Sequence, residues 1–199
     1  MKFFIVGKHA SSKHEALNNI EELGGKVARE FSNLPSVAEN VYIDPKYLRY
    51  EQEDIDAIFN NRTFLTMGPV EEGGLLDGYK YYRGIDFYHY DKADALVLSP
   101  RQLTNINKHV LNQPTVFVWM DNNRDNRIHK HVADKRIYDF VEVEKLESSY
   151  DADFVKTIYN FPNSSLIYFN NECPERVACI VYTLIKHPEL LDIFIKHFN

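Results

Sequence analysis

The first residues of the chain constrain the fold most, because they read as a strand, a loop and a helix in immediate succession. The apolar run Phe3–Val6 has the length and composition of a buried strand. Gly7 ends that run, small polar residues follow, and a helical pattern extends over Lys13–Leu23. A loop that leads into a helix N-terminus can wrap its backbone N–H groups around an anion. The opening therefore predicts an α/β protein with an anion-binding turn at Ser11, Ser12 and Lys13.

Gly7 and Lys13 have the spacing of the phosphate-binding loop, in which a second glycine precedes the lysine and a hydroxyl residue follows it. Ser12 stands in place of that second glycine, and His14 stands in place of the hydroxyl residue. A non-glycine residue held at positive φ costs about 1–2 kcal/mol, which phosphate binding can offset. Mg²⁺ prefers oxygen ligands to imidazole. Lys13 is therefore expected to contact a phosphate without a standard magnesium ligand beside it. The alternative is an ordinary strand–loop–helix with a surface lysine.

Composition favours a globular protein and excludes two kinds of partner. The chain has 199 residues, 44% of them apolar, which suffices for one domain with a full core. Its formal net charge of -6 argues against binding to nucleic acid, which needs a basic patch. No apolar run approaches the ~18 residues of a membrane span, so no membrane contact is expected. The two cysteines are too few for a disulfide framework, and a cytoplasmic setting is the simplest interpretation.

Strands and helices are expected to alternate along the chain. Short apolar runs between helical segments are typical of buried parallel strands, and three follow the first one: Ala95–Leu98, Thr115–Met120 and Leu166–Phe169. Other β-prone stretches are Lys26–Phe31, Thr63–Met67, Tyr79–Tyr82 and Ile85–Tyr90, and further helices are expected over Leu103–Leu111, Tyr138–Tyr159, Pro174–His187 and Glu189–Phe198. We predict an α/β fold with a mostly parallel sheet flanked by helices, a small insertion over 34–90 and a basic helical segment over 121–136.

The order of these parts resembles the guanylate-kinase-like branch of the nucleoside monophosphate kinases along most of the chain. The opening GKHASSKHEAL is similar to the phosphate-binding loop of that family, and TFLTMGPVEEGGLLDGYKYY to its glycine-rich acidic segment. The stretch ADALVLSPRQL resembles the central strand, TVFVWMDNNRDNRIHKHVADKR a strand with the lid, and SSLIYFNNECPERVACIVYTLI the closing strand and helix. The resemblance implies one P-loop kinase-like domain over 1–199, with a substrate-binding insertion and a lid.

The resemblance also implies three groups of site residues. The donor phosphates of ATP, with Mg²⁺ in an active enzyme, are expected at Gly7, Ser11, Ser12, Lys13 and His14. The acceptor nucleotide is expected at Thr66, Glu71, Glu72, Asp77, Tyr79 and Tyr81. The lid contributes Arg124 and Arg127, which with Lys13 are the candidate catalytic residues, because lid arginines neutralise charge on the transferring phosphoryl group.

Three features depart from the family pattern. The loop lacks its second glycine and its hydroxyl residue, as described above. Met67, Gly68 and Val70 occupy the region where the family has two arginines for the acceptor phosphate. Asp94 precedes the central strand instead of ending it, so no Walker B carboxylate is assigned.

Two groups of charged or titratable residues also have simpler interpretations. Arg124 and Arg127 are three residues apart and share one helix face, which in the simpler case is only a solvated surface. Their removal is then expected to change stability by only about 0.5 kcal/mol. Four histidines are interpreted as surface residues: His9, His14, His129 and His131. No metal site is expected from them, since such sites need three or four converging ligands.

Two functions stay open from the sequence. One is ATP-dependent phosphoryl transfer to a nucleoside monophosphate, with a nucleotide or another phosphate-containing small molecule as the ligand. The other is a catalytically inactive module of the same fold that binds a protein partner, of a kind that would suit a bacteriophage accessory protein. The three departures bring the second function level with the first, because phosphoryl transfer depends on positioning by all these parts together.

Overall fold

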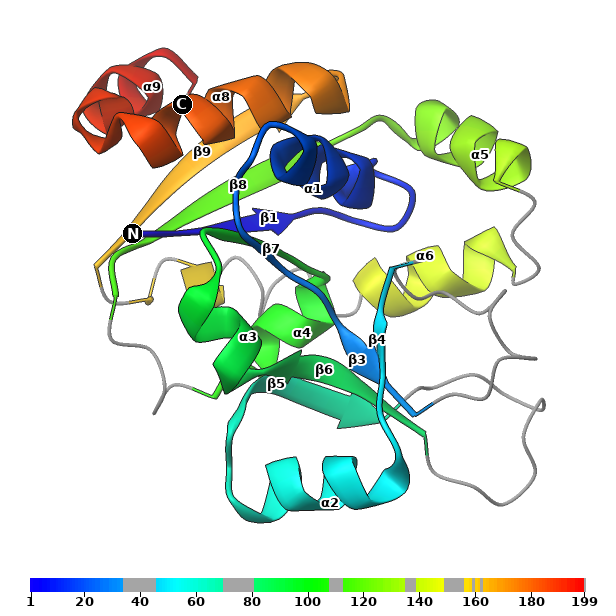
Figure 1. Ribbon diagram of the computed structural model, residues 1–199. Coiled ribbons are helices and arrows are strands. Elements are labelled where there is room, and N and C mark those ends of the chain that lie inside the picture. The colour runs from blue at the N-terminus through cyan, green and yellow to red at the C-terminus, as the bar shows by residue number, and fades with distance from the viewer. Residues whose placement is uncertain are drawn as a thin grey trace.

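The larger of two sheets holds five parallel strands in the order β2-β7-β1-β8-β9 (Figure 1). Its strands are β1 (Lys2–Val6), β2 (Val27–Ala28), β7 (Ala95–Leu98), β8 (Thr115–Asp121) and β9 (Ser164–Asn170). This computed structural model describes residues 1–33, 46–69, 81–107, 113–134, 139–148, 156–158, 160–161 and 163–198. The predicted α/β class and the mostly parallel sheet flanked by helices are confirmed.

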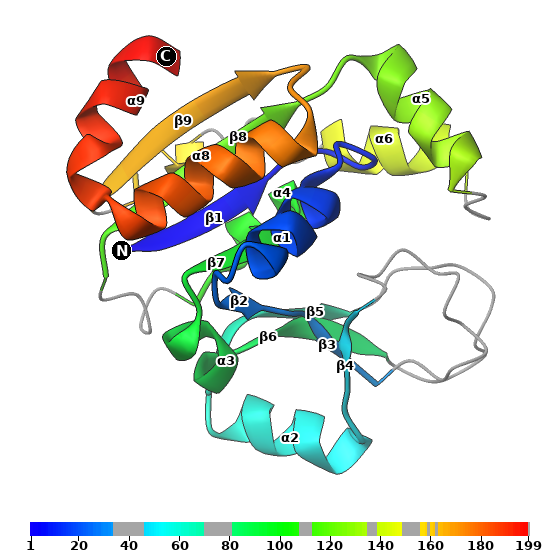
Figure 2. The ribbon, with the colours of Figure 1, turned by 45° about the horizontal axis from the view of Figure 1, so that its top comes forward.

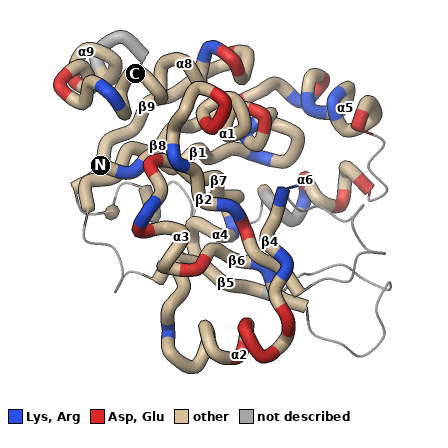
Figure 3. The backbone as a smooth tube through the Cα atoms, in the orientation of Figure 1, with Lys and Arg blue, Asp and Glu red and all other residues tan. Residues whose placement is uncertain are grey.

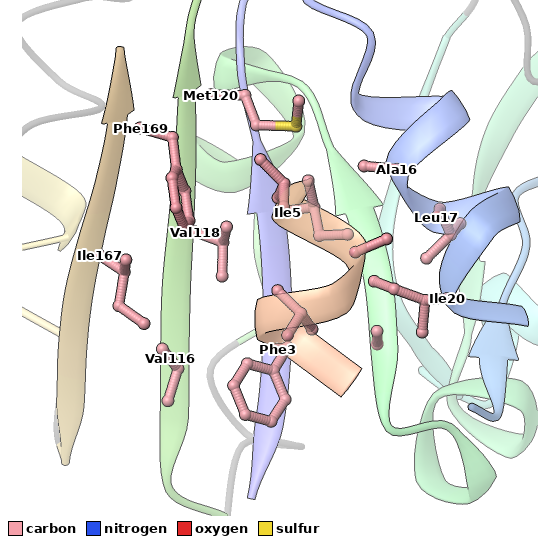
Figure 4. Packing of buried hydrophobic residues seen from close by; sticks show 14 of the residues in the cluster. Phe3, Ile5, Ala16, Leu17, Ile20, Val116, Val118, Met120, Ile167 and Phe169 are labelled. Carbon is pink, nitrogen blue, oxygen red and sulfur yellow. The ribbon is translucent and has the colours of Figure 1, made fainter. Parts of the chain in front are cut away.

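The strand β1 is apolar throughout because both of its faces are covered. Phe3 and Ile5 point to one face, where they pack with α1 and the helices of the C-terminal segment (Figure 4). Phe4 and Val6 point to the other face, into a second cluster that includes Phe117. Period-two alternation inside a continuous apolar run is expected for a strand that lies in the middle of a helix-covered sheet.

Helices cover both faces of this sheet, as the two views in Figures 1 and 2 show. On the first face lie α1 (Lys13–Glu22), α8 (Pro174–Lys186) and α9 (Leu191–Phe198), the last preceded by the short 3₁₀ helix η3 (Pro188–Leu190). On the second face lie α3 (Phe87–Lys92) and α4 (Pro100–Thr104). None of the helices in the described part of the chain is long and apolar enough to cross a membrane.

The smaller sheet has the strand order β4-β3-β6-β5 and falls almost entirely within the predicted insertion. It consists of β3 (Phe31–Ser32), β4 (Leu48–Arg49), β5 (Phe64–Pro69) and β6 (Tyr82–Asp86), with α2 (Gln52–Asn60) beside it. The pairs β3–β6 and β5–β6 are antiparallel. A hydrogen bond of 3.1 Å from Thr66 Oγ1 to the carbonyl oxygen of Gln102 joins this sheet to α4.

Three predicted elements differ from the structure for local reasons. The stretch Lys26–Phe31 divides between β2 and β3, which belong to different sheets. Phe87–Lys92 is helical instead of extended, because the Asp86 carboxylate accepts a hydrogen bond from the backbone N–H of His89 and caps α3. The helix expected from Leu103 begins earlier, at Pro100, where Ser99 and Gln102 form a capping box.

The segment after β8 also differs from its prediction. One long helix was expected over Tyr138–Tyr159, and the structure has α6 over Phe140–Ser148. Much of the remaining segment, 149–155, lies outside the described residues. The basic segment does form a helix, α5 (Arg124–Ala133), as expected. The extent of the chain as one domain stays a prediction.

Candidate phosphate-binding site

The loop after β1 lies at the carboxyl edge of the larger sheet. Val6 pairs with Leu98 of β7 on one side and with Trp119 of β8 on the other, so β1 and β7 end level with each other and β8 continues for two more residues to Asp121. From β1 the chain continues toward β2, and from β8 it continues toward β9, on opposite sides. In open α/β sheets, ligands bind where neighbouring connections diverge in this way.

The loop has the backbone geometry that its spacing predicts. Gly7 lies outside β1, and α1 begins at Lys13. Ser12 precedes the helix with φ 64 and ψ 16, the left-handed conformation that the second glycine of the motif would adopt without strain. The Ser12 side chain makes no capping hydrogen bond to the helix. The strain expected at this position is therefore present, and the first backbone N–H groups of α1 have no cap from Ser12.

Position 7 requires glycine, because Ser11 and the backbone of Met120 leave no room for a Cβ atom there. A Cβ atom at Gly7 would lie 2.4 Å from Ser11 Oγ and 2.7 Å from the carbonyl oxygen of Met120. Ser11 is 1% exposed, and its Oγ has no hydrogen-bond partner among the described residues. The Asn122 amide donates a 3.2 Å hydrogen bond to the carbonyl oxygen of Ser11, which ties the loop to the segment after β8. The loop therefore holds a buried hydroxyl group in a tightly closed turn.

Lys13 is buried, with only 2% of its surface exposed, so the alternative of a surface lysine is wrong. Its Nζ donates a 3.0 Å hydrogen bond to the carbonyl oxygen of Lys8, five residues earlier. The ammonium group is thus folded back over the loop. In this position it contributes positive charge beside the N-terminus of α1, where the helix dipole also favours an anion.

Arg124 and Arg127 both bind one carboxylate, that of Glu144 on α6. Arg124 Nε donates to Oε2 at 2.8 Å, and Arg127 Nη2 donates to Oε1 at 2.6 Å. The two arginines therefore share one face of α5, as their spacing predicts. Partial burial raises the pKa of the Glu144 carboxyl, but the hydrogen bonds and charges of both arginines outweigh it and hold this pKa below its usual value.

The expectation that both arginines are exposed is wrong for Arg127. The Arg124 side chain is 53% exposed, whereas that of Arg127 is 7% exposed. The Arg127 guanidinium lies 5.4 Å from the centre of the Phe140 ring. Its Nε and Nη1 atoms have no hydrogen-bond partner within the described ranges. Arg127 is thus a buried cation with spare donors, not part of a solvated surface.

Three side-chain contacts join α5 and α6 to the loop and α1. His131 Nδ1 lies 3.1 Å from His9 Nε2, and Lys130 forms an ion pair with Glu15 on α1. The Phe140 ring contacts both histidines. Arg127 is four residues before His131 and lies on the same face of α5, where it contacts Glu144 and Phe140 of α6. Figures 1 and 2 show both helices beyond the sheet edge at which this loop lies.

The histidines of the loop and of α5 are only partly the surface residues that were expected. His9 and His131 are buried, His14 is half-buried, and His129 is exposed. The sequence carries no signal that separates the buried pair, His9 and His131, from an exposed histidine such as His129. Figure 3 shows basic and acidic residues mixed along α5, so the basic stripe of the sequence does not form an unbroken positive face.

The side chains at the loop do not fit a Mg²⁺ ion. His14 follows Lys13 and offers imidazole, and Ser99, which follows β7, caps α4. Asp94 accepts a 2.9 Å hydrogen bond from the backbone N–H of Lys26 at the opposite end of β7. No cluster of three or more metal-ligating side chains occurs in the part of the chain that is described. Mg²⁺ needs several oxygen ligands in near-octahedral geometry, which this set does not supply.

The acceptor residues are only partly described. Thr66 is buried on β5, and Tyr81 is half-buried immediately before β6. Glu71, Glu72, Asp77 and Tyr79 lie outside the described residues. The binding and catalytic roles of the sequence candidates stay predictions.

A pocket between β5, β6 and α4 contains two arginines that were not among the candidates. Its lining includes Thr66, Arg83, Arg101 and Asn105. Arg101 could have been found, because it comes three residues after a predicted buried strand whose end lies at the ligand edge. Arg83 carries no such signal, since its position depends on the pairing of β6 with β5.

Comparisons with known proteins found similarities among solved structures. No family model and no curated protein matches the sequence. Among solved structures, the crystal structure of guanylate kinase from Anaplasma phagocytophilum is similar with a TM-score of 0.46 and 10% sequence identity, over 96% of this chain and 86% of that chain.

Proposed function

We propose that this chain binds the phosphate groups of a nucleotide between the loop 7–12 and α5. The observation that carries the proposal is that the loop and α5, which meet through His9 and His131, each hold buried polar groups without partners in the part of the chain that is described. Ser11 Oγ and the Arg127 atoms Nε and Nη1 are buried without partners among the described residues, beside a helix N-terminus. Each buried unsatisfied polar group costs about 1–3 kcal/mol. A phosphate group in this position would satisfy several of them at once.

The chemistry of these groups suits phosphate better than a protein carboxylate. A guanidinium can donate two parallel hydrogen bonds to one phosphate. Lys13 adds a compact positive charge, and the N-terminus of α1 adds backbone N–H groups and its dipole. A polyphosphate chain offers enough oxygens to meet the loop, Lys13 and Arg127 together, which a single carboxylate does not.

The reaction that fits this arrangement is phosphoryl transfer from ATP to a nucleoside monophosphate. The acceptor would lie in the pocket of Thr66, with Arg83 and Arg101 supplying the positive charge that the sequence motif lacks. In that reaction an acceptor phosphate oxygen bonds to the γ-phosphorus as the bond to the β,γ-bridging oxygen breaks. Lys13, Arg124 and Arg127 would orient the donor and offset the charge on the transferring group.

A second candidate is a protein-binding module that does not catalyse this transfer. It is favoured because the cationic side chains of the site already have hydrogen-bond partners within the protein. Lys13 donates to Lys8 within the loop, and Glu144 accepts from both Arg124 and Arg127. His14 supplies no oxygen ligand for a metal. On this interpretation the loop and its neighbouring helices have only a structural role, and a partner protein binds elsewhere on the surface.

Calorimetric titration with ATP distinguishes the two functions. We expect the unmodified protein to bind ATP, with or without Mg²⁺, because the donor set does not depend on the metal. The variant R124A/R127A should weaken this binding by at least about tenfold. The control R176A removes an exposed arginine in the first turn of α8, which pairs with Glu172 and not with a group of the proposed site, and it should leave the affinity unchanged. Absence of ATP binding in the unmodified protein would overturn the proposal and leave the second candidate.

A further inference from the structure

The carboxylate of Glu144 sits on the two arginines in the way that a phosphate would. Each of its oxygens accepts from a different guanidinium, Oε2 from Arg124 at 2.8 Å and Oε1 from Arg127 at 2.6 Å. Two oxygens of one anionic group, shared between two arginines, are the geometry in which arginine pairs bind phosphate. The two arginines that are proposed to bind the ligand therefore already bind a carboxylate of the protein itself.

Glu144 leaves part of this arginine pair available. The Nε and Nη1 atoms of Arg127 have no partner among the described residues even while Nη2 is bound to Glu144. These two atoms are buried, so an incoming phosphate gains them as the carboxylate moves aside. Two arginines and one carboxylate also leave a net positive charge, which still attracts an anion.

The Glu144 contact is also placed so that it can break. Its side chain is 20% exposed, and Arg124 is more than half exposed, so water can replace the contact between them. Helix α6 has a separate attachment through Phe140, which packs against His9 and His131. Release of Glu144 therefore does not require α6 to detach from the loop.

We infer that Glu144 is an internal competitor for the phosphate ligand, so that α6 lowers the affinity of the site until a nucleotide displaces this carboxylate. The inference rests on the proposed function, since it needs a ligand that uses the same arginines. It makes α6 a regulatory element, because anything that holds Glu144 away from Arg124 and Arg127 would tighten nucleotide binding.

Titration of ATP against E144Q tests this competition. The change keeps the shape of the side chain and removes its charge. We expect E144Q to bind ATP about tenfold more tightly than the unmodified protein, which corresponds to ~1.4 kcal/mol. The matched control is E142Q, an exposed residue on the same helix, which should bind as the unmodified protein does. In the R124A/R127A background, E144Q should give no gain, because the contested groups are absent.

The outcomes separate this inference from the proposed function. If the unmodified protein binds ATP and E144Q binds it equally or more weakly, Glu144 supports the arginines instead of competing, and the inference fails alone. If neither protein binds ATP, both fail. Should E144Q not fold, a carbon-13 NMR titration of the unmodified protein decides, because Arg127 binds Glu144 in the free protein and the ligand in the complex. Saturating ATP should raise the pKa of the Glu144 carboxyl toward its usual value as it loses both arginines, and an unchanged or lower pKa overturns the inference.

Discussion

The side chains of His9 and His131 meet with 3.1 Å between Nε2 and Nδ1, although one belongs to the loop after β1 and the other to α5. One ring nitrogen must donate and the other accept, so this contact is made by at least one neutral imidazole. Their ring centroids are 5.4 Å apart, and the Phe140 ring lies against both. The pair therefore ties the loop to α5 and, through Phe140, to α6.

Replacement of His131 should show how much this contact stabilises the protein. We expect H131A to lower the free energy of unfolding by about 1–3 kcal/mol, because it removes a buried hydrogen bond and its packing on Phe140. H129A, two residues earlier on the exposed side of α5, should change it by less than about 0.5 kcal/mol. Urea melts of both variants measure the difference, and equal effects would contradict a stabilising role for the pair.

Gly7 should tolerate no side chain, whereas Gly68 should accept one. G7A forces a Cβ atom against the carbonyl oxygen of Met120, a backbone atom that cannot rotate away. We expect this overpacking to cost about 1–3 kcal/mol in thermal or urea unfolding. G68A meets nothing within 4 Å and serves as the matched control. Similar losses in both variants would mean that the close approach at Gly7 is not what restricts this position.

Restoring the standard loop residues should raise any phosphoryl transfer activity. Ser12 is strained at positive φ, and His14 offers no oxygen ligand, so the variant S12G/H14S relieves both defects. We expect transfer from ATP to GMP by the unmodified protein to be absent or at least about tenfold slower than by this variant, a barrier difference of ~1.4 kcal/mol. A coupled assay measures it. Turnover by the unmodified protein at about 1–100 per second would refute the inactive module.

The Glu144 contact should contribute to stability in a defined pH range. The pKa of this carboxyl is lowered in the folded protein, while the unfolded chain has the usual value of about 4.3. The unfolded chain therefore binds the proton more readily, so the contribution is complete above about pH 4.3 and is lost as the pH falls through the folded-state pKa. Urea melts below pH 5 should show a shallower loss of stability for E144Q than for E142Q. Parallel curves would exclude this contribution.

The sequence predicted the larger sheet well, because its signals are local. Apolar runs marked β1, β7, β8 and β9, and each lies where the run predicts. The glycine-to-lysine spacing also located the start of α1. Only the short β2 was misjudged, since its two residues carry too little pattern to separate them from β3.

The site was less predictable, because its key features arise from contacts between distant segments. The burial of Arg127 depends on Phe140 and on the loop, and the contact of His9 with His131 spans 122 positions. Glu144 looked like any charge on a helical surface. Arg83 lines the pocket beside Thr66 only through the pairing of β5 with β6. No residue spacing encodes these relationships in a single sequence.

The central place of β1 has a consequence for how the chain is made. Phe3 pairs with Ala95 on one side and Val116 on the other, so neither neighbour exists when the first strand leaves the ribosome. At about 5–20 residues per second, this apolar stretch waits several seconds for its partners. Unpaired apolar strands of this kind associate readily with other chains. Among the strands of the larger sheet, the one at its centre is therefore the one that stays without its neighbours longest while translation continues.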